Sequence, residues 1–296
     1  MKKASVVFAS ALFLAGTALF GQNVPQINTH THQYPIRGWA RPGGGGGQNL
    51  TYHKNGTVIR NAHLVMIFWG PSFGSGGADS GYATTLQNFR NQYGTNPEFN
   101  TITQYYGEDA VAGYGNISQS NLAGGTADWF DSSTPPTNVT DSAVQGEVQR
   151  YLASHAFDNS AIYEVFIPGT SYSSDGSSTS CGGPSLAYCA YHGYFSYQGN
   201  SVKYSIEPYP NCSGCAASGF NTVQNQEHFV CHETREAVTD SLLNAWYDRR
   251  GYEADDKCAW SPTPFGDSST GTNQDGTAFA YQYEWSNANG GCVKTR

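Results

Sequence analysis

Residues Glu227–Asp240, EHFVCHETREAVTD, gather more potential metal ligands than any other stretch of this 296-residue chain. An α-helix advances by about 100° per residue, so residues four apart lie on the same side. The candidate ligands on that side are His228, His232 and Glu236, with Glu233 and Asp240 beside them. The other side carries apolar residues such as Val230 and Val238. The stretch therefore predicts a helix with one side packed on a sheet and the other side bearing ligands.

Working outward from this helix, the sequence predicts alternating strands and helices. His63–Trp69 and Ile162–Ile167 are apolar runs typical of buried strands, and Thr57–Arg60 resembles a shorter strand. Tyr82–Tyr93 and Asp141–His155 have helical spacing of apolar residues. We therefore expect one α/β or α+β domain, with a mixed sheet flanked by helices.

The ordered domain is expected to span residues 50–296, preceded by a signal peptide over 1–21 and a flexible lead over 22–49. Lys2 and Lys3 followed by a short apolar run are typical of a secretory signal peptide. The lead is rich in proline and ends in five consecutive glycines, 43–47. His30 and His32 fall in this lead, where we expect a solvated tail. No later apolar run is long enough to span a membrane.

Charge and cysteine content favour an exported protein. The net charge is −8 and only 13% of residues are charged, which argues against nucleic-acid binding and against an anionic membrane surface as partner. All seven cysteines lie in the C-terminal half, and in an exported chain they indicate disulfides. The sequence does not fix the pairing. The expected pairs are Cys181 with Cys189, Cys212 with Cys215 and Cys258 with Cys292, which leaves Cys231 free.

The pattern His-Glu-x-x-Glu on a helix points to metal chemistry. In zinc peptidases with His-Glu-x-x-His, the residues four apart bind the metal and the intervening glutamate polarises the attacking water. By that logic His232 and Glu236 are two ligands and Glu233 is the general base. The second carboxylate makes the site more anionic, so zinc is the expected ion and another divalent cation is the alternative.

The third ligand has to come from outside the pair on the helix. Glu253 is preferred, as in zincins whose third ligand is a downstream glutamate, and His228 is the alternative on the same helix. Asp256 or Asp240 is expected to hold a ligand through a hydrogen bond. A further histidine, His192, follows Cys189 closely, and we interpret it as a structural histidine beside a disulfide.

Several short segments resemble, in the same order, the plant EXORDIUM or phosphate-induced secreted proteins. They are Leu50-Thr51-Tyr52-His53 with Gly56, Phe68-Trp69-Gly70, Cys189-Ala190-Tyr191-His192-Gly193 and Cys212-Ser213-Gly214-Cys215. The likeness covers most of residues 50–260. It implies export and a shared architecture, and a role in extracellular growth signalling without an established enzyme activity.

Two functions follow as hypotheses. The first is a secreted or periplasmic metal-dependent hydrolase, zinc being the expected ion, that acts on protein or peptide substrates as a metallopeptidase. The second is a non-catalytic extracellular or cell-wall-associated protein like the EXORDIUM family, in which the helix is structural. The metal content of the purified protein distinguishes the two.

Overall fold

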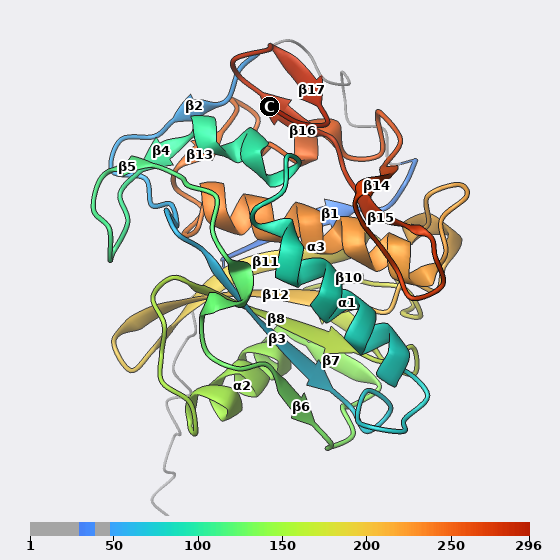
Figure 1. Ribbon diagram of the computed structural model, residues 1–296. Coiled ribbons are helices and arrows are strands. Elements are labelled where there is room, and N and C mark those ends of the chain that lie inside the picture. The colour runs from blue at the N-terminus through green and yellow to red at the C-terminus, as the bar shows by residue number, and fades with distance from the viewer. Residues whose placement is uncertain (1–29, 39–47) are drawn as a thin grey trace, which may run out of the picture.

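The computed structural model describes residues 30–38 and 48–296 (Figure 1). The expected signal peptide over 1–21 and the run of five glycines at 43–47 lie outside the described residues. The expected flexible lead over 22–49 is wrong for its central part, because His30–Pro35 forms a strand of the main sheet. Six residues of this short segment pair with a neighbouring strand, with a shift of register between Tyr34 and Pro35.

A six-stranded mixed sheet forms the centre of the molecule, in the order β1-β11-β12-β8-β3-β6 (Figure 1). Strand β11 is antiparallel to both of its neighbours, whereas β12, β8, β3 and β6 run parallel to one another. The six strands are β1 (His30–Pro35), β3 (His63–Trp69), β6 (Trp129–Asp131), β8 (Ala161–Ile167), β11 (Tyr188–Tyr197) and β12 (Asn200–Pro208). The predicted mixed sheet with flanking helices is confirmed.

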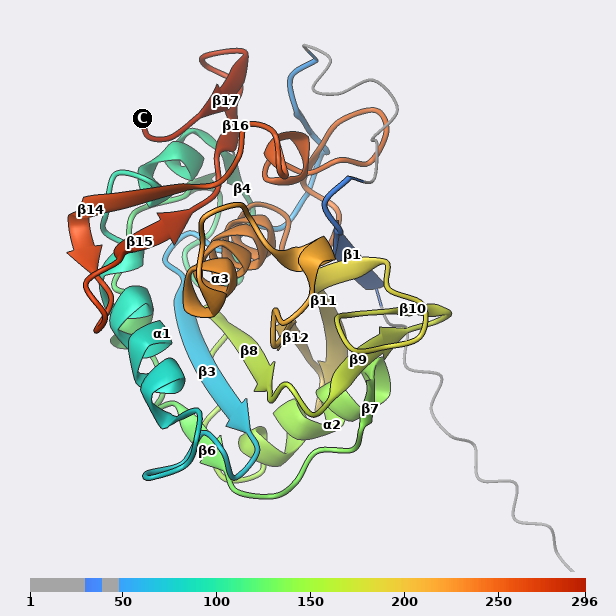
Figure 2. The same ribbon diagram turned by 90° about the vertical axis from the view of Figure 1, so that its right-hand side faces the viewer.

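Three α-helices cover the two faces of the sheet, α1 (Ser80–Tyr93), α2 (Asp141–Leu152) and α3 (Thr222–Thr239). Alternate residues of β3 and β8 face opposite sides, so Leu64, Met66 and Phe68 share one core with α1 and α3. Val65 and Ile67 share the other core with α2. Figure 2 shows α1 and α3 on one side of the sheet and α2 on the other. All three helices were predicted at these places.

The remaining strands form small sheets around this centre. They are β2 (Thr51–Tyr52), β4 (Tyr106–Gly107), β5 (Gly115–Asn116), β7 (Asn138–Thr140), β9 (Tyr172–Asp175), β10 (Ser178–Thr179), β13 (Trp246–Tyr247), β14 (Phe265–Thr272), β15 (Ala278–Tyr281), β16 (Glu284–Ser286) and β17 (Gly291–Val293). The predicted strand over Thr57–Arg60 is wrong, since only Thr57 makes an isolated bridge, to Glu108.

One of these small sheets joins two distant parts of the chain. Strand β2 pairs with β13, and the backbone N–H of His53 donates to the carbonyl of Ala245 at 2.8 Å. Gly56 follows at a position where a Cβ would lie 2.4 Å from the Cα of Ala245. A side chain at residue 56 would therefore push the chain that follows α3 away from β2.

Helix α3 begins five residues earlier than predicted and is buried on all sides. The side chain of Asn221 accepts from the backbone of Gln224, whose side chain in turn accepts from the backbone of Asn221, which forms a capping box. Every residue from Gln224 to Thr239 is buried. Helix α1 and β15 lie on one side of α3, and β11 and β12 on the other. The sequence predicted a ligand side apart from the side that packs on the sheet, but the ligand side is buried as well and meets His192 of β11, Asp256 and Gln282.

The three disulfides join Cys181 to Cys212, Cys189 to Cys215 and Cys258 to Cys292, and Cys231 is free and buried. The last pair and the free cysteine agree with the prediction, and the other two pairings are wrong. The hairpin of β11 and β12 explains the correct pairing. Because these strands are antiparallel, the chain just before β11 meets the chain just after β12. Each of the first two disulfides therefore links the chain at or just before the start of β11 to the chain that follows β12.

Candidate metal centre

Two histidines face each other across the edge of the main sheet. His32 on β1 is the register partner of His192 on β11. Side chains of directly opposed residues point to the same face of a sheet, and the two rings have centroids 5.8 Å apart. Both side chains reach carboxylates, His192 that of Glu233 on α3 and His32 that of Asp256. The strand register therefore brings two imidazoles beneath α3.

Helix α3 adds His232, Glu233 and Glu236. The Nε2 atom of His232 lies 3.1 Å from Oε2 of Glu236, one helical turn on. The Nδ1 atom of His192 lies 3.1 Å from Oε2 of Glu233 and 3.8 Å from Oε2 of Glu236. His232, Glu233 and Glu236 all belong to the buried part of α3. Their side chains therefore face an enclosed polar site rather than solvent.

Gln282 orients the His232 ring from the opposite side. Its side-chain amide donates to the backbone carbonyl of Asp255 at 2.8 Å, which leaves Oε1 facing Nδ1 of His232 at 3.2 Å. That oxygen accepts a hydrogen bond from Nδ1, so Nε2 of the neutral ring keeps a free lone pair. This is the arrangement of a histidine ligand fixed by an outer hydrogen bond.

The segment after β13 supplies Glu253 and Asp256. The backbone N–H of Asp256 donates to Oε1 of Glu236 at 2.8 Å. The His32 ring lies between the two acids, with Nε2 at 2.5 Å from Oδ2 of Asp256 and Nδ1 at 3.5 Å from Oε1 of Glu253. His192 approaches the same Glu253 oxygen at 3.6 Å. Both acids therefore belong to the same cluster as the α3 residues.

A buried ion triad holds this segment against α3. Arg235, fully buried, forms an ion pair with Asp255 and lies 2.6 Å from the carboxylate of Glu284. The disulfide between Cys258 and Cys292 fixes the same segment from its other end. We call Arg235, Asp255 and Glu284 the Arg235 triad. The Arg235 guanidinium neutralises Asp255 and Glu284, and among the described residues it forms no ion pair with a ligand candidate.

Three overlapping groups of ligand atoms, each within 4.8 Å of one another, meet in this cluster, and all three contain Glu236. They are His232 with Glu236 and Asp256, His32 with Glu236 and Glu253, and His192 with Glu233 and Glu236. Tetrahedral zinc with ligands at about 2.0–2.2 Å places neighbouring ligand atoms roughly 3.4 Å apart. The separation of 3.1 Å between Nε2 of His232 and Oε2 of Glu236 is close to this value. Because the three groups share Glu236, they form one continuous cluster.

The negative charge of the cluster lacks cationic partners other than histidine. Glu233 and Glu236 are fully buried, and Glu253 is 2% exposed. Within residues 30–38 and 48–296, the ion pairs of these three glutamates are all with His32, His192 or His232. Buried carboxylates without compensation are costly, so they either hold protons or share a cation.

The pKa directions of the cluster are mixed: burial lowers the pKa of His232, but the Glu236 carboxylate outweighs it and raises the net value above the usual one. Burial, together with the neighbouring acids, raises the pKa of Glu233 and that of Glu253 well above the usual range. Burial and the neighbouring histidines hold the pKa of His192 well below its usual value, so its ring is neutral, as a metal ligand requires. Burial lowers the pKa of His32, but the Asp256 carboxylate outweighs it and raises the net value to about 9.

Five of the predicted site residues come together: His232, Glu233, Glu236, Glu253 and Asp256. His228, the alternative third ligand, does not join them. Its ring packs between Phe229 and Trp260, and it belongs to none of the ligand groups among the described residues. Asp240 instead stabilises the end of α3, where its carboxylate accepts from the backbone N–H groups of residues 244 and 245, each at 2.5 Å.

The sequence interpretation missed His32 and His192. The expected solvated tail is wrong for His32, and His192 contacts an acid of the cluster although it also lies three residues from a disulfide cysteine. Alternation in the strand places His192 on the face opposite Tyr191, which packs in the core with α2. No spacing within the sequence links residue 32 to residue 256, because the contact depends on the pairing of β1 with β11.

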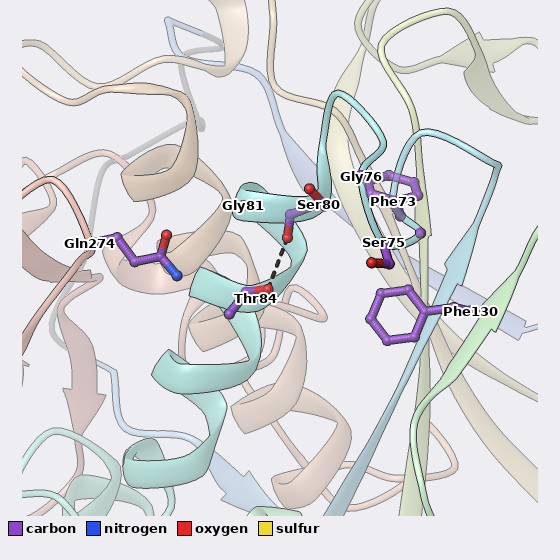
Figure 3. Close-up of a pocket in the computed structure, with 9 residues that line it drawn as sticks. Phe73, Ser75, Gly76, Ser80, Gly81, Thr84, Phe130 and Gln274 are labelled. Atoms are coloured by element: carbon purple, nitrogen blue, oxygen red, sulfur yellow. Dashed lines mark hydrogen bonds between the residues drawn. The ribbon is translucent and has the colours of Figure 1, made fainter.

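Two surface cavities lie apart from the centre. The larger one, about 640 Å³, is at the start of α1, and its lining includes Phe73, Ser80, Thr84, Phe130 and Gln274 (Figure 3). In Figure 3 the hydroxyl of Thr84 donates to the carbonyl of Ser80 at 2.9 Å. This lining contains no acid, histidine or cysteine, so it offers no group for acid–base or metal chemistry. The other cavity, about 390 Å³, includes Asp79 and Tyr209 but no residue of the centre.

Comparisons with known proteins identify no relative of this chain. No protein-family model, curated protein or solved structure matches it. Within the described part of the chain, no helix combines the length and the apolar character needed to cross a membrane.

Proposed function

We propose that this protein is an exported hydrolase that binds one divalent cation, zinc by preference, at the centre formed around Glu236, and that its substrates are polypeptides. The observation that carries the proposal is the convergence of His232, Glu236 and Asp256, from a helix and a distant loop, onto one ligand group. His192 lies at the edge of the same group; its Nδ1 donates to Glu233, so its Nε2, 3.6 Å from Glu253, is the atom available as a further nitrogen ligand.

The donor set favours zinc over hard cations. Imidazole nitrogens together with carboxylate oxygens are a common zinc ligand set, whereas calcium and magnesium select oxygen ligands alone. A divalent charge would also compensate buried acids that no lysine or arginine among the described residues pairs with. The outer hydrogen bond from His232 to Gln282 supports the same assignment, since it leaves Nε2 free to bind.

Peptide hydrolysis gives Glu233 and His192 roles beside the metal ligands. A bound zinc ion lowers the pKa of a water molecule and polarises a substrate carbonyl. Glu233 accepts a proton as the water oxygen bonds to the carbonyl carbon, and it delivers that proton to the amide nitrogen as the C–N bond breaks. The hydrogen bond with His192 holds the Glu233 carboxylate next to Glu236. One water is consumed, and an acid and an amine are released.

Export is part of the proposal. Three disulfides form in the C-terminal half of the chain, and such cross-links persist in oxidising compartments. Together with the expected signal peptide over 1–21, they support a secreted or periplasmic protein.

The alternative function is a non-catalytic extracellular or cell-wall-associated protein like the EXORDIUM family, in which α3 is a structural helix. The complete burial of Glu233 favours this alternative, because a general base has to reach the substrate. The two functions differ in two results. Only the hydrolase requires a bound cation, and only the hydrolase loses an activity when Glu233 is replaced by glutamine.

Metal analysis of the purified full chain tests the proposal. We expect about one zinc ion per chain and loss of most of it in His232→Asn. His228→Asn is the matched control, because it makes the same substitution one turn earlier on α3, outside the ligand groups. Wild-type protein that binds no divalent cation after incubation with zinc would refute the metal centre.

The catalytic part needs a second variant. Glu233→Gln should retain the ion and lower the rate of peptide hydrolysis by about 10²–10⁴-fold, the typical contribution of a general base. Unchanged hydrolysis would remove Glu233 from the mechanism. If wild type and Glu233→Gln both retain the ion and neither hydrolyses a denatured protein substrate, the hydrolase is refuted and the protein is non-catalytic.

A further inference from the structure

Strand β1 lies at the edge of the main sheet and covers the candidate metal centre. Figure 2 shows β1 outside β11, at the end of the strand order. The side chain of His32 is 22% exposed, whereas those of Glu253 and Asp256 are 2% exposed. His32 therefore lies between the buried ligands and the solvent.

Two alternate side chains of β1 fill the groove between β11 and α3. His32 contacts Asp256 and Glu253, as described above. Tyr34 is fully buried, and its ring stacks on His232 with centroids 4.0 Å apart and on Trp260 with centroids 5.2 Å apart. The groove therefore has a polar position where His32 contacts Asp256 and Glu253. It has an aromatic slot two residues further along β1, where Tyr34 lies.

The rest of β1 makes the contacts that an extended peptide makes with a sheet edge. Its backbone pairs antiparallel with β11 along its whole length. The indole of Trp260 donates to the carbonyl of Pro35 at 2.8 Å. On the other face, Thr31 and Gln33 donate to the carboxylate of Asp175 at 2.7 and 2.9 Å.

The groove is cross-linked, but β1 is not. The disulfide of Cys189 anchors β11, and that of Cys258 anchors the segment that carries Asp256. The first cysteine of the chain is Cys181, so no disulfide can hold the N-terminal segment. The chain after β1 contains five consecutive glycines, which have no side chains to pack. Departure of β1 would leave both cross-linked walls in place and expose the hydrogen-bonding edge of β11.

We propose that the groove along β11 is a binding site for an extended polypeptide and that β1 is its resident occupant, which keeps the centre closed through His32. A polypeptide would pair antiparallel with β11 by β-strand addition, as β1 does. Because Tyr34 fills a slot between two aromatic rings, the preferred ligand carries an aromatic side chain at that place. The catalytic consequence rests on the proposed metal centre, whereas peptide binding along β11 does not.

The first experiment uses full-length variants of β1. His32→Ala should keep about one zinc ion per chain and hydrolyse a denatured protein at least tenfold faster than wild type, because β1 loses its contacts with Asp256 and Glu253 and gives way more readily to water and substrate. Gln33→Ala is the matched control on the same strand, and its side chain contacts Asp175 on the opposite face. Loss of zinc from His32→Ala would overturn this inference, because His32 would then be a permanent metal ligand. The proposal of a metal centre would still stand.

The second experiment needs neither metal nor catalysis. A recognition sequence for a specific protease replaces the glycines at 43–47, and the purified full chain is cut there. A fluorescently labelled peptide with the sequence of residues 30–36 should exchange into the cut chain, as measured by anisotropy, and should bind the uncut chain at least tenfold more weakly. A peptide with alanine at the position of Tyr34 should bind the cut chain at least tenfold more weakly than the unchanged peptide.

The outcomes separate the two proposals. A cut chain that takes up no peptide, or an uncut chain that binds it equally well, overturns the groove. Wild-type protein without metal overturns the proposed hydrolase, and the peptide measurement then still decides the groove. If zinc is bound and His32→Ala is no faster than wild type, β1 does not close the centre and this inference is wrong.

Discussion

Glu164 on β8 provides a test of the polar layer beneath α3. Its side chain is fully buried and accepts a hydrogen bond from the hydroxyl of Thr234 at 2.8 Å. Burial raises its pKa from 4.5 to about 8. The substitution Glu164→Gln keeps an oxygen that can accept from Thr234 and removes the titratable proton. We expect this variant to be more stable than wild type at neutral pH and similar to it at acidic pH.

The sign follows from proton binding. The folded chain holds the Glu164 proton up to about pH 8, whereas the unfolded chain releases it near pH 4.5. The folded state therefore binds more protons between these values, and the free energy of unfolding falls as the pH rises. Each pKa unit corresponds to about 1.4 kcal/mol, so wild type should lose about 3 kcal/mol relative to Glu164→Gln between about pH 5 and pH 7.5.

Urea unfolding of the two full-length proteins at several pH values measures this difference. Glu108→Gln is the control, since residue 108 is exposed. A stability difference between wild type and Glu164→Gln that stays constant over this pH range would refute the argument. It would mean that the Glu164 carboxyl is ionised in the folded protein and has a compensating charge.

Three further predictions concern the supports of the centre. Gln282→Leu removes the outer hydrogen bond of His232 and should weaken zinc binding about 10–100-fold in competition with a chelator; unchanged affinity would show that the ring needs no such support. Arg235→Leu leaves the two acids of the Arg235 triad buried without a cation, and the free energy of unfolding in urea should fall by about 3–5 kcal/mol; a loss below about 1 kcal/mol would contradict the triad. Joint replacement of Cys258 and Cys292 by serine opens a loop with a sequence separation of 34 and should cost about 2–4 kcal/mol in the same assay as well as zinc affinity; a variant as stable as wild type would argue against this role.

The elements that the sequence predicted are those with a local signal. Strands β3 and β8 are continuous apolar runs, and α1 and α2 repeat apolar residues at helical spacing. Strand β11 was missed because its ten residues mix tyrosine, glycine, serine and histidine without a simple alternation. The early start of α3 did have a local signal, since Asn221 and Gln224 have the spacing of a capping box.

The candidate site was predictable only within α3 and the acids that follow it. His232, Glu233 and Glu236 are placed by helical geometry, and that alone indicates a shared face. Glu253 was chosen because it lies downstream, and the structure brings it to His32 as well. The two additional histidines come from β1 and β11, whose pairing depends on strand register. Register is a tertiary property, so no rule of local spacing could place His32 opposite His192.

The burial of α3 separates its structural polar residues from its functional ones. A polar side chain inside a fold needs a partner, and most of those on α3 have one among neutral or oppositely charged groups. Gln226 bonds to Glu207 at 2.7 Å, Thr234 bonds to Glu164, and Arg235 pairs with its triad. Glu233 and Glu236 each keep one carboxylate oxygen without a hydrogen-bond partner among the described residues, as do Glu227 with one oxygen and His228 with both ring nitrogens. The oxygens of Glu233 and Glu236 differ from those of Glu227 and His228 in that they belong to acids that face the three histidines, so a cation at this place would satisfy both of them.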